Sequence, residues 1–90
     1  MSTRVDVDID ELERFAAQLQ QFNQQLEQIA YGIDGHLQQL GSSWRDDQYA
    51  KFADEWHSAF SAVYRYIDQS APEFVRYLKV KAAKLRDARG

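Results

Sequence analysis

The chain has 90 residues, a net charge of −3 and no cysteine, which limits it to one small domain without disulfides or thiolate metal sites. With 44 % hydrophobic and 28 % charged residues, it is too apolar to be disordered and too polar to span a bilayer. The first residues contain no apolar stretch followed by a small-residue cleavage site, so we expect no removable secretory signal peptide. These features predict a single folded domain over residues 1–90, without membrane insertion.

A long first helix is predicted between residues 9 and 40, where large apolar residues recur at alternating steps of three and four. The seam consists of Leu12, Phe15, Leu19, Phe22, Leu26, Ile29, Ile33, His36 and Leu40. A seam that repeats about every 3.5 residues is typical of a helix that packs lengthwise against another helix. The sequence therefore indicates a helical interaction module.

The start of this helix is marked by Asp8 as the N-cap and Glu11 as the return arm of a capping box, with Val7 and Leu12 placed as a hydrophobic staple. Gly32 and Gly35 interrupt the pattern, but the seam keeps its phase across them. We therefore expect one continuous helix, the alternative being a turn within residues 31–36.

A tight turn and a second long helix, over residues 44–88, follow from the next signals. Gly41 is a candidate C-cap and Ser43 a candidate N-cap, with Asp46 three residues beyond it. The apolar stripe of the second helix contains Tyr49, Phe52, Trp56, Phe60, Val63, Ile67, Ala71, Phe74, Leu78 and Leu85. Because this stripe keeps its phase across Pro72, a kink is favoured over the start of a third helix.

The fold class expected from these elements is all-α, an antiparallel two-helix hairpin. Its second helix carries an apolar arc too wide for one antiparallel neighbour to cover, which favours dimerisation into a four-helix bundle. The dimer or partner interface is predicted at Leu19, Phe22, Leu26, Trp56, Phe60, Val63 and Ile67. The partner is either a second copy or a similar hairpin.

The sequence gives little support for nucleic-acid binding, catalysis or metal binding. The acidic start of the first helix and the basic end of the second lie side by side in a hairpin, which explains the charge asymmetry without a nucleic-acid partner. His36 and His57 lack the clustered ligands or nucleophiles of a site, and adjacent carboxylates such as Asp54 and Glu55 point away from each other on a helix. We expect no catalytic residue, metal or cofactor.

The turn resembles that of the Trp-x-Gly small helical hairpins associated with type VII secretion. The residues that carry the resemblance are Leu40, Trp44 and Phe52, while Asp46 stands where the family has glycine. Exported members carry a Tyr-x-x-x-Asp/Glu signal after the second helix. Here the corresponding Tyr77 and Lys81 have the wrong charge, whereas Tyr64 and Asp68 match the spacing inside the predicted helix.

The resemblance implies a non-enzymatic binding protein, a small substrate or effector partner of a type VII-like system that is secreted without a signal peptide. Its partners would include a larger effector or a secretion ATPase. The alternative is a cytoplasmic adaptor that covers a helical segment of a larger protein.

Overall fold

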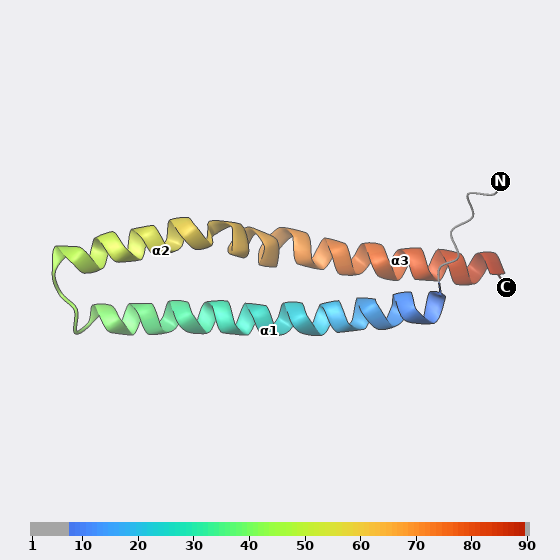
Figure 1. Cartoon of the computed structure of the whole chain (residues 1–90), viewed down its shortest axis with the longest axis horizontal. Coiled ribbons are helices and arrows are strands. Elements are labelled where there is room, and N and C mark those ends of the chain that lie inside the picture. Colours follow the sequence, from blue (N-terminus) through green and yellow to red (C-terminus); the bar gives the residue numbers. More distant parts are fainter. Residues whose placement is uncertain (1–7, 90) are drawn as a thin grey trace.

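Two antiparallel helical rods make up the computed structural model, which describes residues 8–89 (Figure 1). The first rod is α1 (Ile9–Gly41), and the second runs without a break through α2 (Asp47–Arg65), the π-helical turn η1 (Tyr66–Ser70) and α3 (Ala71–Arg89). The hairpin measures 65 × 25 × 15 Å along its principal axes. The predicted all-α hairpin is confirmed.

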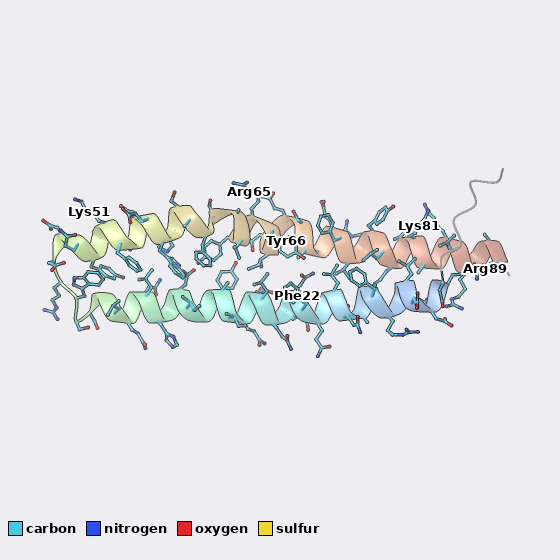
Figure 2. All side chains as sticks on the ribbon, in the orientation of Figure 1. Phe22, Lys51, Arg65, Tyr66, Lys81 and Arg89 are labelled. Atoms are coloured by element: carbon cyan, nitrogen blue, oxygen red, sulfur yellow. The ribbon has the colours of Figure 1, made fainter. Side chains whose placement is uncertain are left out.

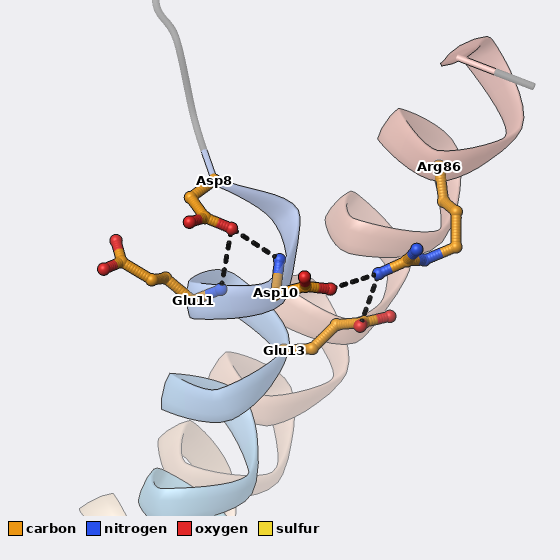
Figure 3. Close-up of polar contacts among 5 residues, drawn as sticks. All are labelled: Asp8, Asp10, Glu11, Glu13 and Arg86. Carbon is orange, nitrogen blue, oxygen red and sulfur yellow. Dashed lines mark hydrogen bonds and ion pairs between the residues drawn. The ribbon is translucent and has the colours of Figure 1, made fainter.

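The predicted N-cap of α1 is confirmed. The Asp8 carboxylate accepts hydrogen bonds from the backbone N–H groups of Asp10 at 2.9 Å and Glu11 at 3.2 Å (Figure 3). These bonds satisfy two of the donors that a helix start leaves open. The Glu11 side chain points away from Asp8, so the reciprocal half of the predicted capping box is not formed. Val7, the other half of the predicted staple, lies outside the described residues.

Helix α1 continues through both of its interior glycines. It contains 33 residues and no described glycine has a positive φ, so the alternative of a turn within residues 31–36 is wrong. A Cβ added at Gly32 or Gly35 would meet no atom within 4 Å. Neither glycine is needed for close packing inside this hairpin.

The connection between the rods differs from the prediction at its second half. The Ser43 hydroxyl donates to the Leu40 carbonyl at 3.2 Å, and the N-cap of α2 is Asp46, whose carboxylate accepts from the N–H groups of Gln48 and Tyr49. The prediction of Ser43 as N-cap is therefore wrong, and the helix begins at Asp47 instead of residue 44. A carboxylate is the better cap, because its charge also interacts favourably with the positive end of the helix dipole.

Gly41 has a role other than the predicted C-cap. It is the last residue of α1, the cap position belongs to Ser42, and φ at Gly41 is not positive. An added Cβ would lie 2.7 Å from the ring of Tyr49, whose hydroxyl donates to the Leu37 carbonyl at 2.7 Å. Glycine is needed here because the Tyr49 ring crosses the helix end in close contact.

The second rod passes Pro72 by widening into a π-helical turn immediately before it. The Ala71 N–H bonds to the Tyr66 carbonyl, five residues back, which places one extra residue in the turn. Proline supplies no N–H and its ring crowds the preceding turn, so a wider turn relieves both effects. The rod bows gently here but does not reverse, as predicted (Figure 1).

The core is made largely of small side chains. The buried residues are Ile9, Ala16, Ala30, Leu37, Ile67, Ala71, Val75 and Ala82. None of them lies in α2. Most of the apolar packing therefore joins α1 to η1 and α3, in the half of the hairpin away from the turn.

The predicted seam of α1 has the correct repeat, but only part of it faces the second rod. Leu12, Leu19 and Leu26 are half-buried between the rods, whereas Phe15 and Phe22 are 52 % and 54 % exposed. Their predicted seam positions are occupied by a line of residues spaced by seven, namely Ile9, Ala16, Asn23, Ala30 and Leu37. Small residues on this line let the rods approach closely and leave the large rings outside.

Candidate interaction surface

A continuous apolar surface follows one edge of the hairpin. This apolar strip consists of Phe15, Phe22, Ile29, Ile33 and Leu40 on α1 together with Phe74 and Tyr77 on α3, each at least 40 % exposed. Residues spaced by seven lie nearly in line on a helix, so the first three form one ridge. Exposed apolar surfaces of this kind mark sites of protein interaction.

The strip is hollowed near the termini. Phe15, Leu19, Phe74, Tyr77 and Leu78 line a shallow depression between α1 and α3. No charged side chain is among its lining residues. Such a depression suits an apolar side chain from a partner.

Seven aromatic rings lie in successive contact from the turn toward the middle of the hairpin. In order of contact, this aromatic ladder consists of Tyr49, Trp44, Phe52, Trp56, Phe60, Tyr64 and Tyr31. Its closest rings are those of Trp56 and Phe60, which stack with centroids 4.1 Å apart. The ladder runs along α2 and the turn before it, and only its last contact, between Tyr64 and Tyr31 with centroids 6.0 Å apart, joins α2 to α1.

The predicted turn motif comes together within this ladder. The Trp44 backbone N–H donates to the Leu40 carbonyl at 2.8 Å, and the Trp44 ring contacts Phe52 at a centroid distance of 6.0 Å. Asp46, in the place of the family's glycine, caps α2. The departure from the motif therefore has a structural use.

The opposite edge of the hairpin is polar. Asn23 on α1 and Val75 on α3 each face the other rod. Because each residue turns a helix by about 100°, their two neighbours in sequence point to opposite edges of the hairpin. Phe22 and Phe74 lie on the apolar edge, and Gln24 and Arg76 lie on the polar edge. A bond from Lys79 to Gln20, at 2.9 Å, crosses between the rods. Figure 3 shows the bonds from Arg86 to Asp10 and Glu13, at 3.0 and 2.7 Å, which also cross. The two carboxylates raise the pKa of the Arg86 guanidinium, with Glu13 the larger cause. Exposed pairs of this kind are screened by salt and serve mainly to set the register.

Two tyrosine–aspartate bonds cross between the rods at the middle of the hairpin. The Tyr64 hydroxyl donates to Asp34 at 2.6 Å, and the Tyr31 hydroxyl donates to Asp68 at 3.0 Å. Burial and the bond to Asp34 raise the pKa of Tyr64, while the bond to Asp68 is the main cause of the raised pKa of Tyr31. His57 Nε2 lies 3.7 Å from the same Asp34 carboxylate. Tyr64 and Asp68, the predicted export pair, are thus both bonded to α1, and their role as a signal stays a prediction.

The predicted interface residues are divided between the inside and the outside of the hairpin. Phe22 lies on the apolar strip, while Ile67 is only 8 % exposed because the hairpin itself covers it. The remaining residues are half-buried between the rods, namely Leu19, Leu26, Trp56, Phe60 and Val63. Phe15 and Ile29, which belong to the seam predicted from the sequence, lie on the surface instead. The pattern of α1 alone would not have identified them as surface residues, because the line of Ala16 and Ala30 is selected by the small residues of α3 that face it.

Metal and membrane chemistry find no place among the described residues. Within residues 8–89 no group of three or more histidine, aspartate or glutamate side chains could hold a metal ion. No helix in that range is long and apolar enough to cross a membrane.

The hairpin with its aromatic turn and exposed apolar edge defines a class of small helical binding modules. Residues 4–89 match the WXG100 family, described as proteins of 100 residues with WXG, and the chain belongs to this family. WXG100 proteins are non-enzymatic type VII secretion substrates, secreted without a signal peptide, and they typically dimerise as helical hairpins. The chain has no significant match among the curated proteins or among the solved structures.

Proposed function

We propose that this secretion substrate acts as a homodimer, in which two hairpins meet along their apolar strips and form a four-helix bundle. The observation that carries the proposal is the ridge of Phe15, Phe22 and Ile29, each more than half exposed along one line of α1. Together with Phe74 and Tyr77 it forms a surface that the single hairpin leaves in water.

The free energy available from covering the strip supports stable pairing. Removing apolar surface from water contributes about 25 cal/mol per Å², so burying several large side chains yields several kcal/mol. This amount is comparable with the whole stability of a small domain. Aromatic side chains at the centre of a covered surface also contribute most of the binding energy in known interfaces.

The border of the strip favours a second copy as the partner. On α1 the strip is flanked by the uncharged amides Gln18 and Gln25. A two-fold dimer places the same surface patch on both sides, so a charged border would bring like charges together. The uncharged amides avoid this repulsion along the middle of α1, while the charged neighbours Glu11, Glu73 and Lys81 lie toward the ends of the strip or on α3. A larger effector or a secretion ATPase, the other predicted partners, would then meet the dimer outside the strip.

The mass of the purified protein in solution tests this proposal. By light scattering after gel filtration we expect twice the 10.5 kDa mass of the chain. Phe22→Glu places a charge at the middle of the strip and should give a monomer. Val80→Glu is the matched control, because Val80 is 45 % exposed but lies outside the strip, and it should remain dimeric.

A monomeric wild-type protein at about 100 μM would contradict the homodimer, since the estimated burial predicts much tighter pairing. Dimers of equal stability in both variants would place the interface on another face. If the wild-type chain is monomeric but pairs with a similar hairpin, and Phe22→Glu abolishes that pairing, the strip is the interface of a heterodimer.

A further inference from the structure

A second groove lies on the polar edge of the hairpin, opposite the apolar strip. It has a volume of about 520 Å³ and runs beside η1 and the first turns of α3. Its floor is formed by Asn23, Ile67, Ala71 and Val75, and its rims carry Gln20, Gln24 and Glu27 on α1 and Arg76 and Lys79 on α3. It shares no lining residue with the hollow of the strip.

Two residues that line this polar groove have hydrogen-bond donors without an acceptor among the described residues. The Asn23 side-chain oxygen accepts from the Tyr66 hydroxyl at 2.8 Å, but its amide nitrogen is buried and has no hydrogen-bond partner. Leaving a buried donor unpaired costs about 1–3 kcal/mol. Arg76 is exposed and forms no hydrogen bond or ion pair with any described residue. Asn23 and Arg76 therefore offer donors that no acceptor of the groove satisfies, although Glu27 lines the same groove.

We propose that this groove binds an extended, acidic segment of a partner protein. Carboxylates of the segment would lie against Arg76 and Lys79, where the opposite charges attract. Apolar side chains between those carboxylates would cover Ile67 and Val75. Glu27, which also lines the groove, repels acidic residues, so the carboxylates of the segment lie beside Arg76 and Lys79.

The unpaired amide of Asn23 favours an extended segment over a helix. The carbonyl groups of a helix are already bonded within the helix, whereas an extended backbone presents free carbonyls. One such carbonyl can accept from Asn23 Nδ2 on the floor of the groove. This inference does not rest on the proposed dimer, because pairing through the strip leaves the polar edge uncovered.

Titration of the isotope-labelled full chain with a defined peptide tests the inference. The probe is an acetylated eight-residue peptide of alternating Glu and Leu, compared with the same peptide containing Lys in place of Glu. We expect the acidic peptide to shift the NMR signals of the side-chain amides of Asn23, Gln20 and Gln24. The basic peptide should leave these signals unchanged.

Three variants separate a built groove from general charge attraction. Arg76→Glu should weaken binding of the acidic peptide at least tenfold. Lys81→Glu changes the charge of the same helix by the same amount, but Lys81 does not line the groove, so it should change binding by less than twofold. Asn23→Asp keeps an acceptor for Tyr66, removes the unpaired donor and should also weaken binding at least tenfold.

Several results would overturn the inference. The first is an absence of binding at about 1 mM acidic peptide, which corresponds to a binding free energy of only about −4 kcal/mol. The second is an equal loss of binding in Arg76→Glu and Lys81→Glu. The third is a set of NMR shifts confined to the strip around Phe15 and Phe74. Binding of anionic lipid vesicles that depends on Arg76, without binding of the peptide, would also overturn it. Circular dichroism of each variant confirms that the hairpin is intact.

Discussion

The two halves of the hairpin are held together in different ways. Beside the termini, α3 packs on α1 through Ala71, Val75 and Ala82, which are 1–7 % exposed. Beside the turn, α2 has no buried residue and is joined to α1 by half-buried side chains, by the ring contact of Tyr64 with Tyr31 and by tyrosine hydroxyls. Figure 1 shows the rods closer together along α3 than along α2. Small side chains let backbones approach, whereas large rings keep them apart.

This difference explains why the strip and the polar groove lie where they do. Because small residues occupy the contact between α1 and α3, large side chains of both helices lie at the edge, where they form the strip. At the junction of the halves, η1 and Pro72 change the spacing of the rods beside Asn23, and the groove lies at this junction. Figure 2 shows side chains occupying the space between the rods along the hairpin.

The largest expected effect comes from enlarging a residue in the close-packed half. Ala16 is 1 % exposed, so Ala16→Leu adds volume where the rods touch and should lower the free energy of unfolding by about 2 kcal/mol. Urea unfolding followed by circular dichroism measures this change. Ala17→Leu is the matched control, because Ala17 is exposed on the same turn of α1, and its effect should be within about 0.5 kcal/mol. Equal tolerance of both variants would contradict close packing at Ala16.

The spacing of the apolar residues along α1 was predictable from the sequence. Which line of residues faces the second rod was not. Apolar spacing identified the helix, since period is a strong signal. The choice between the line of Phe15 and the line of Ala16 depends on what faces them. The alanines of α3 select Ala16, and nothing in a single helix distinguishes it from Ala17. The large residues of the seam were predicted to form the contact between the rods, but small residues form much of it.

The N-cap of α2 and the geometry of the helix before Pro72 could not be predicted from the sequence, because more than one set of local bonds is possible at each place. Ser43 and Asp46 are both good N-caps, and the structure resolves the choice because the Ser43 hydroxyl bonds to the end of α1. Pro72 predicted a disturbance of the helix. Whether the helix kinks, ends or widens into a π turn depends on packing of both sides of the rod, which a local pattern does not contain.

A smaller effect is expected where the less closely packed half begins, at the contact between Gly41 and Tyr49. Gly41→Ala should displace the ring of Tyr49 and break its bond to Leu37, lowering the free energy of unfolding by about 1–2 kcal/mol. Gly32→Ala is the control, because the space around Gly32 is open, and it should stabilise the helix by up to about 1 kcal/mol. Opposite signs in thermal or urea unfolding would confirm the contact. Stabilisation by both variants would show that Tyr49 does not lie across the helix end.

The smallest expected effect concerns the hydroxyl bonds that hold α2. Tyr64→Phe keeps the ring in the ladder but removes the bond to Asp34, so the free energy of unfolding at neutral pH should fall by about 0.5–1 kcal/mol. The pKa of Tyr64 is raised in the folded chain. Its contribution is therefore fully present below the unfolded pKa of about 10 and is lost as pH rises through the folded pKa. Tyr77→Phe, which removes a hydroxyl that is exposed and bonded to no described residue, should leave the pH profile unchanged. If alkaline unfolding is the same in wild type and Tyr64→Phe, the bond of Tyr64 to Asp34 does not stabilise the contact of α2 with α1.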